Sequence, residues 1–287
     1  MSADKVKCVV WDLDNTIWDG ILAESDQVTL KNNIKPIITE LDNRGILQSI
    51  SSKNDYDVAK AKLKEFQLWD YFIYPQINWN PKSEAIKTIA KSINIGIDTL
   101  AFVDDQPFEL EEVGYACPDV RCINANELEG LLDMDCMNPK FVTSDSKNRR
   151  QLYQNDITRN AVEKDFNGTQ EEFLASLNMN FRISRAKESD LQRVEELTVR
   201  THQLNSTGYI YSYDELCECI KNDKYEVLVT RLDDKYGSYG TIGLSLIEKY
   251  SDIWEVKLLI MSCRVMSRGV GNILLNHICN EARKSGV

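Results

Sequence analysis

Histidine is scarce in this sequence, which has only His202 and His277 among 287 residues. A Ser-His-Asp triad and most catalytic zinc sites depend on imidazole, so this scarcity argues against both. No run approaches the roughly 20 apolar residues that a membrane span needs, and the first residues lack the basic and apolar segments of a signal peptide. The eight cysteines are scattered, as is typical of reduced thiols. We therefore expect a cytoplasmic protein that does not enter a membrane.

Positive charge is also in short supply. The chain has 34 Lys and Arg against 45 Asp and Glu, a formal net charge of -11. Non-specific binding of nucleic acid relies on clustered Lys and Arg that neutralise phosphates, so we expect no nucleic-acid partner. Any anionic ligand of this chain must be held by a local positive charge.

The order of elements predicts two domains of the α/β class. Continuous β-branched or apolar runs, typical of strands buried on both faces, alternate with segments whose apolar residues recur at helical spacing. This alternation indicates a parallel sheet with helices on both faces, whose ligands bind beyond the carboxyl ends of the strands. We expect domains at 1–140 and 181–287, joined by a helical connecting segment at 141–180. The expected strands of the first domain are 6–11, 46–51 and 99–103, and its expected helices are 34–44, 55–66 and 83–94.

Polar side chains gather where these strands end. Because the carboxyl ends of parallel strands meet at one edge of a sheet, we expect them to share a cleft. Several carboxylates in one cleft suit Mg²⁺, a hard cation that prefers oxygen ligands and the oxygens of phosphate. A lysine and hydroxyl groups nearby would hold the phosphate. The residues concerned are Asp12, Asp14 and Thr16 after the first strand, Ser51, Ser52, Lys53 and Asn54 after the second, Lys82 before the third helix, and Asp104 and Asp105 after the last strand.

Each of these residues also has a simpler interpretation. A lone Asp-x-Asp is common in turns, and Asp104 and Asp105 would suit the cap of a helix at 107–113. Lys82 would ordinarily be a solvated surface residue. The occurrence of all four groups in this order favours a site.

The four segments "WDLDNTIWDG", "SSKN", Lys82 and "FVDDQP" resemble the four motifs of the haloacid dehalogenase (HAD) superfamily, which is rich in Mg²⁺-dependent phosphatases and phosphotransferases. The resemblance implies a HAD-like Rossmannoid sheet and assigns roles residue by residue. Asp12 matches the nucleophile and metal ligand, and Asp14 matches the general acid/base, whose carbonyl also binds metal. Ser52 matches the phosphate-binding hydroxyl, Lys82 the stabilising cation, and the pair Asp104 and Asp105 the remaining metal ligands.

The second half of the chain resembles the GNAT acyltransferase fold, an α+β domain. Its order is a strand, a helix, a hairpin around "DDKYGSYG", another strand, and a Gly-rich turn "RGVG" that opens a helix. In the GNAT pattern Gln or Arg stands three residues before the first glycine, whereas this chain has Met266. Because the GNAT fold continues beyond the equivalent of Val287, we expect this domain to be truncated at its C-terminus.

A HAD unit followed by "RTHQLNSTG", "DKYGSYGTIG" and "MSCRVMSRGVG" is similar to the FkbH-like proteins of polyketide assembly lines. That resemblance implies a glyceryl transferase and phosphatase that takes 1,3-bisphosphoglycerate, loads the glyceryl group on the phosphopantetheine of an acyl carrier protein, and removes the 3-phosphate. Such proteins often carry a cysteine as acyl acceptor where this chain has Ser51, and a hydroxyl is the weaker nucleophile.

Two other functions remain open. The first is a HAD-type phosphatase of small metabolites, which needs only Asp12, Asp14, Ser52, Lys82 and Mg²⁺. The second is a non-catalytic docking module for carrier proteins. An acidic carrier protein would be attracted to a basic patch, for which Arg149 and Arg150 are candidates, with Arg182, Arg185 and Lys187.

Overall fold

The computed structural model describes residues 6–25, 27–200 and 209–287. The chain forms two compact units, Met1–Tyr153 and Gln154–Val287. The boundary falls inside the expected connecting segment 141–180, within helix α6 (Arg149–Lys164). Residues 201–208, which hold most of the "RTHQLNSTG" motif, lie outside the described residues. In the part of the chain that the structure describes, no helix has both the length and the hydropathy that a membrane crossing requires.

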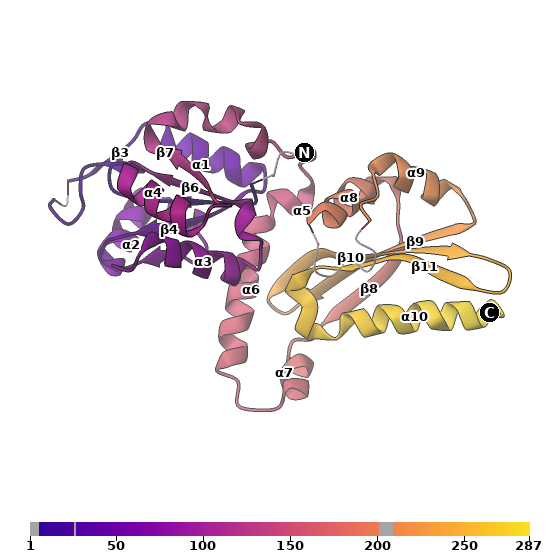
Figure 1. Cartoon of the computed structure of the whole chain (residues 1–287). Coiled ribbons are helices and arrows are strands. Elements are labelled where there is room, and N and C mark those ends of the chain that lie inside the picture. The colour runs from indigo at the N-terminus through magenta and orange to yellow at the C-terminus, as the bar shows by residue number, and fades with distance from the viewer. Residues whose placement is uncertain (1–5, 26, 201–208) are drawn as a thin grey trace. The chain divides into compact units, whose positions relative to one another are not determined.

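The first unit is built around a five-stranded parallel sheet with helices on both faces (Figure 1). The strand order is β5-β4-β1-β6-β7, so β1 is central, with β4 and β5 on one side of it and β6 and β7 on the other. The α/β class predicted for this half is thereby confirmed. The strands are β1 (Cys8–Trp11), β4 (Leu47–Ser52), β5 (Gln76–Ile77), β6 (Leu100–Asp104) and β7 (Arg121–Asn124). The helices are α1 (Ile34–Asn43), α2 (Tyr56–Glu65), α3 (Lys82–Ile93), α4 (Pro107–Ala116) and α5 (Ser144–Lys147), with 3₁₀ turns η1 (Trp69–Tyr71), η2 (Ile97–Thr99), η3 (Ala125–Asp133) and η4 (Asp135–Met137).

The core explains why β1 is continuously apolar. All four of its residues are buried, because helices cover the sheet on both sides. Val9 and Trp11 belong to the core cluster on the face that α1 covers. In α1 the four buried residues recur at i, i+3, i+4 and i+7, the spacing that keeps one helical face on the sheet. The packing fixes the end of β1, and therefore the backbone at Asp12.

A short hairpin follows β1 directly. It pairs β2 (Trp18–Asp19) with β3 (Thr29–Leu30), and Trp18 lies opposite Leu30. Asn15 adopts a positive φ of 53°, and its side chain accepts a hydrogen bond from the amide of Gly20. This turn brings Trp18 back beside Asp14, with which it forms an isolated β-bridge.

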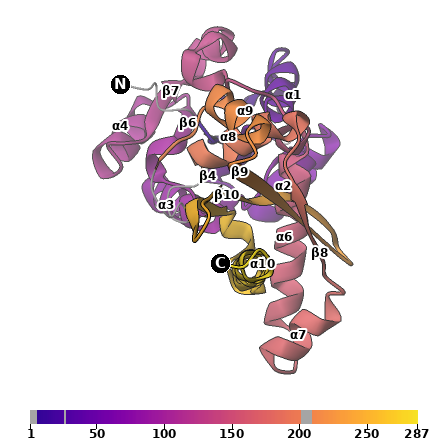
Figure 2. The ribbon, with the colours of Figure 1, turned by 90° about the vertical axis from the view of Figure 1, so that its right-hand side faces the viewer.

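The second unit is a four-stranded antiparallel sheet of order β11-β10-β9-β8. Helices α8 and α9 contribute to the core cluster on one face, and α10 contributes to the cluster on the other, an arrangement visible in Figure 2 along the axis of α10. As expected, a glycine opens α10: Gly269 has φ 71° at the N-cap. The elements are α7 (Gln170–Ser176), β8 (Asn180–Arg185), η5 (Glu188–Asp190), α8 (Leu191–Arg200), α9 (Tyr213–Lys221), β9 (Tyr225–Asp234), β10 (Gly237–Lys249), β11 (Trp254–Met261), η6 (Cys263–Arg268) and α10 (Val270–Lys284).

A buried arginine joins α6 to this antiparallel sheet. Arg159 is fully buried and donates to both carboxylate oxygens of Asp234, at 2.7 and 2.9 Å, where β9 ends. It also donates to the carbonyl of Gly237 and stacks on the Tyr239 ring at 3.7 Å. Part of the expected connecting segment is therefore an integral piece of the second unit.

Candidate active site

A buried lysine lies between two carboxylates at the carboxyl edge of the parallel sheet. Lys82 is the first residue of α3 and donates to Asp12 Oδ1 at 2.7 Å and to Asp104 Oδ2 at 2.5 Å. All three side chains are almost fully buried. Trp11 pairs with Val103, so the residues that follow them, Asp12 and Asp104, lie side by side. The expected convergence of these three residues is what the structure shows.

Asp105 completes an acidic cluster. Oxygen atoms of Asp12, Asp104 and Asp105 lie within 4.8 Å of one another. Asp105 Oδ1 is buried, and it has no hydrogen-bond partner among the residues that the structure describes. Oxygens on opposite sides of a magnesium ion lie about 4 Å apart, and carboxylates are among its preferred ligands. The cluster therefore fits a small divalent cation, with Asp105 Oδ1 free of other bonds.

Burial and neighbouring charges shift the protonation of this cluster. Burial raises the pKa of Asp12 to about 7, and the charge of Asp104 adds to this effect while Lys82 opposes it. Burial likewise raises the pKa of Asp105, with Asp104 adding to the shift. For Lys82, burial disfavours the charged form, but the two carboxylates outweigh it and the pKa rises. Lys82 thus keeps its charge, whereas the raised pKa values of Asp12 and Asp105 favour their protonated forms.

Asp14 is held by three hydrogen bonds. Its Oδ1 accepts from Trp18 Nε1 at 2.8 Å and from the amide of Leu22 at 3.0 Å. Its Oδ2 accepts from Asn54 Nδ2 at 3.0 Å. The same Asn54 amide group donates to Ser52 Oγ at 3.2 Å. The structure therefore brings Asp14, Ser52 and Asn54 together, from the ends of β1 and β4.

Two hydroxyl residues of the predicted site are buried near these groups. Val10 pairs with Ser49 and Trp11 with Ile50, so the register, continued by one residue, sets Ser51 beside Asp12. Because side chains alternate along a strand, Ser51 is on the same sheet face as Ser49 and as Val10, the residue opposite Ser49. Thr16 is fully buried, and its Oγ1 lacks a hydrogen-bond partner in the described part of the chain.

Lys53 makes an ion pair that the sequence did not reveal. Its Nζ lies 2.7 Å from Oε1 of Glu109, a buried residue in the first turn of α4. Lys53 follows β4 and α4 follows β6, and these two strands flank β1. The ion pair therefore spans the end of β1, where Asp12 begins the site. Lys53 was predicted to bind substrate, and here its charge is neutralised by Glu109.

Trp18 and Glu109 are the functional candidates that sequence reasoning missed. A tryptophan such as Trp18 is ordinarily interpreted as a core residue. Its distance from Asp14 along the sequence does not indicate that its indole would donate a hydrogen bond to that residue. Glu109 lies in the first turn of a helix, where acidic residues are common because of the helix dipole. Its burial alone distinguishes it, and burial follows from tertiary packing.

One residue of the basic patch predicted from the sequence is not exposed. Arg149 is buried and donates to the carbonyl of Gly45. Arg150 donates to both carboxylate oxygens of Asp42, at 3.0 and 3.1 Å. Both arginines thus bind groups of α1 and the turn after it, because α6 packs there, and Arg149 offers no exposed charge to a partner.

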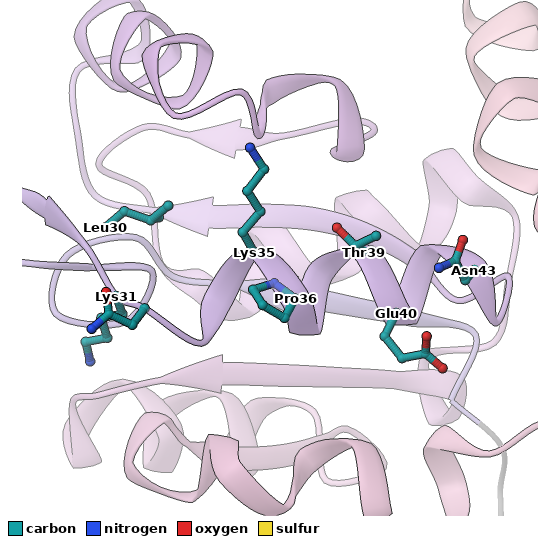
Figure 3. A pocket seen from close by; sticks show the side chains of 8 residues that line it. Leu30, Lys31, Lys35, Pro36, Thr39, Glu40 and Asn43 are labelled. Atoms are coloured by element: carbon teal, nitrogen blue, oxygen red, sulfur yellow. The ribbon is translucent and has the colours of Figure 1, made fainter.

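An open hollow on the surface of the first unit runs along α1 (Figure 3). None of the predicted site residues lines it. Lys35 in this hollow donates to the neutral side chain of Gln67, and Glu40 forms an ion pair with Arg44. The hollow is therefore separate from the acidic cluster. Its lining residues are Leu30, Lys31, Asn32, Lys35, Pro36, Thr39, Glu40 and Asn43.

Comparisons with known proteins give structural similarities only, since no protein-family model and no curated protein matches the chain. One similar structure is the N-terminal part of protein BF1531 from Bacteroides fragilis, which contains a phosphatase domain and was solved in complex with Mg. It is 28% identical to this chain, with a TM-score of 0.42, and the match covers 47% of this chain and 41% of that one. The chain thus spans less than half of that structure.

Two further structures resemble parts of the chain. A HAD-superfamily hydrolase from Ehrlichia chaffeensis is 15% identical, with 43% of this chain and 88% of that one covered and a TM-score of 0.36. The ribosomal-protein-S18-alanine N-acetyltransferase from Escherichia coli is 18% identical, with a TM-score of 0.31. The match covers 38% of this chain and 63% of that one. All three TM-scores are below 0.5, so the function of this chain has to be argued from its own site.

Proposed function

We propose that the first unit is a Mg²⁺-dependent phosphatase or phosphotransferase in which Asp12 is the nucleophile. The observation that carries this proposal is the position of Lys82, whose ammonium group bonds to Asp12 and Asp104 beside the third carboxylate, Asp105. A carboxylate nucleophile, a buried cation and an oxygen-rich metal site are the groups that transfer of a phosphoryl group through a covalent intermediate requires.

The residues of the chain can perform both steps of such a reaction. The Asp12 carboxylate attacks phosphorus, the bond from phosphorus to the leaving oxygen breaks, and Asp14 gives that oxygen its proton. Asp14 then takes a proton from the water that attacks the phosphoryl group on Asp12, which releases inorganic phosphate and restores both residues. Lys82 holds positive charge beside Asp12 throughout, and Ser52 provides a hydroxyl for a phosphate oxygen.

The residues that would hold Mg²⁺ are Asp12, the carbonyl of Asp14, and Asp104 or Asp105. When bound there, the ion would neutralise charge on the transferring group and orient its oxygens. The unpartnered Asp105 Oδ1 supports a place for the ion in this cluster.

A direct test is hydrolysis of p-nitrophenyl phosphate with Mg²⁺ and with EDTA. We expect Mg²⁺-dependent release of phosphate from the unmodified protein and a loss of several orders of magnitude in Asp12→Asn, which keeps the size of the side chain but removes the nucleophile. Asp119→Asn, at an exposed position, is the matched control and should retain full activity. Turnover that persists in Asp12→Asn would remove Asp12 from the mechanism.

We further propose that the physiological reaction is glyceryl transfer from 1,3-bisphosphoglycerate to an acyl carrier protein, with removal of the remaining phosphate. The similarity of the sequence to FkbH-like proteins supports this proposal. So does the register that sets Ser51 beside Asp12, because an acyl acceptor at position 51 would lie next to the phosphate site. When the acceptor attacks the acyl carbon of the acyl phosphate, the bond from that carbon to the phosphate oxygen breaks, and phosphate is a good leaving group that needs little acid assistance.

Intact-protein mass spectrometry can test this finer activity. After incubation with 1,3-bisphosphoglycerate, Ser51→Cys should gain the mass of one glyceryl or phosphoglyceryl group, which hydroxylamine removes and a carrier protein accepts. Ser49→Cys is the matched control, since position 49 is buried on the same sheet face but two residues from the edge. If the protein releases phosphate but loads no glyceryl group on the carrier protein, glyceryl transfer is refuted. The function would then be that of a phosphatase of small metabolites.

A further inference from the structure

The indole nitrogen of Trp18 points at a site residue, although the ring itself is buried in the core. Trp18 is fully buried, with its ring 6.1 Å from that of Phe66. Its Nε1 lies 2.8 Å from Asp14 Oδ1. An indole has a single polar hydrogen, and here that hydrogen is given to Asp14.

We propose that Trp18 is a positioning residue that fixes the Asp14 carboxylate so that Asp14 exchanges its proton through Oδ2. This inference rests on the function proposed for Asp14. A carboxylate oxygen accepts about two hydrogen bonds, and Oδ1 already has two, from Trp18 and from the amide of Leu22. Oδ2 has one, from Asn54, and so keeps a free lone pair for the leaving group.

The backbone gives this contact its rigidity. The β-bridge between Asp14 and Trp18, and the pairing of Trp18 with Leu30, fix the main chain on which the indole is carried. The ring is fully buried, and close packing in a core restricts side-chain rotamers. The orientation of Asp14 is therefore set before substrate binds, which is the requirement for an efficient proton donor.

A purely structural role for Trp18 makes a different prediction from a positioning role. If the ring only fills space, its removal slows all substrates alike or lowers the amount of folded protein. If the N–H orients the acid, its loss matters more for a poor leaving group, which needs protonation, than for a good one. The ratio of two rates separates the two roles.

Trp18→Phe removes the donor and keeps an aromatic ring. We expect kcat for glycerol 2-phosphate, an alkyl ester, to fall about tenfold or more, and kcat for p-nitrophenyl phosphate to fall less than about threefold, because general acid catalysis typically contributes 10²- to 10⁴-fold in all. KM should stay within about twofold for both, since Trp18 binds Asp14 rather than substrate. Trp69→Phe, a partly buried tryptophan outside the site, is the matched control and should leave the ratio unchanged. An equal loss for both esters, or a change confined to KM, would overturn the proposal.

Hydrogen exchange of the five tryptophan indoles, followed by NMR, tests the hydrogen bond without any turnover. In Asp14→Ala the Trp18 indole hydrogen should exchange about tenfold faster or more, because a hydrogen bond to a charged group is lost. The other four indoles serve as internal references. An unchanged exchange rate would refute the contact. If the unmodified protein hydrolyses neither ester, the proposed function and the catalytic role of Trp18 fail together. An active protein with an unchanged rate ratio refutes the role of Trp18 alone.

Discussion

Replacing Lys82 with methionine would remove the only positive charge that bonds to Asp12 and Asp104 in the described structure. Methionine has a similar length and no charge, so the change tests electrostatics with little loss of volume. The two carboxylates would remain buried at the carboxyl edge of the sheet. We expect the first unit to lose stability in the absence of metal and to regain most of it when Mg²⁺ is added.

The size of the effect follows from the two contacts. At an effective dielectric constant of 20, opposite charges 2.7 and 2.5 Å apart attract by about 6 kcal/mol each. Desolvation of the ammonium group opposes this attraction, and removal of one partner from a buried ion pair typically costs about 3–5 kcal/mol. Because Asp12 can take up a proton near pH 7, we expect the lower end of that range, about 3 kcal/mol.

Urea unfolding followed by tryptophan fluorescence is a suitable assay. Four of the five tryptophans, at positions 11, 18, 69 and 79, belong to the first unit, so the signal reports mainly on it. Lys87→Met, at an exposed position of the same helix, should change the free energy of unfolding by less than about 0.5 kcal/mol. Mg²⁺ at 100 times its dissociation constant should restore about 2.7 kcal/mol to Lys82→Met.

Two results would refute this reasoning. A loss below about 1 kcal/mol in EDTA would mean that the carboxylates do not depend on Lys82 for their charge balance. A loss of the expected size that Mg²⁺ leaves unchanged would mean that no cation binds among them.

Three further predictions concern protonation, the ion pair across β1 and the second unit. The affinity for Mg²⁺, measured by calorimetry, should rise about tenfold per pH unit between pH 5 and 7 and then level off, because the cation displaces the proton of Asp12, whose pKa is about 7; a flat profile would contradict this. Glu109→Gln should release Lys53 for anions and improve inhibition by inorganic phosphate up to about fivefold, whereas an unchanged inhibition constant would show that Lys53 does not reach the phosphate. Arg159→Lys should destabilise the second unit by about 3 kcal/mol, seen as faster amide hydrogen exchange in β9 and β10, because a lysine cannot bind both oxygens of Asp234; unchanged exchange would refute this.

The position of the acidic cluster was predictable from sequence because it depends on backbone topology. The runs that became β1, β4 and β6 are buried throughout, and the apolar residues in them indicated the strands from the sequence. Once three parallel strands lie side by side, the residues that follow them must meet at one edge. This places Asp12 and Asp104 without any knowledge of side-chain conformation.

The partners of the site residues were not predictable in the same way. Trp18 contacts Asp14 through one atom of a core side chain, and Lys53 meets Glu109 across 56 positions of sequence. Neither contact leaves a periodic pattern. Arg149 was expected at the surface because arginine is seldom buried, and its burial depends on the carbonyl of Gly45 far away in the chain.

The segment 141–180 illustrates a further limit. Helix α6 is strongly polar, and its sequence has the character of a linker. Its structural role depends on Arg159 meeting Asp234, which is 75 residues away. Long-range contacts of this kind change the helix from a connector into part of a core, and no local pattern carries that information.

The contact between Arg159 and Asp234 limits where the chain can be divided into fragments that fold separately. A recombinant fragment that starts at residue 181, where the sequence suggested a domain limit, would lack Arg159 and leave the buried Asp234 without its main partner. The Tyr239 ring would lose the guanidinium that covers it. A fragment that starts before Gln154 keeps both. We therefore expect the shorter fragment to aggregate on expression and the longer one to be recovered folded. We also expect limited proteolysis of the whole chain to spare α6.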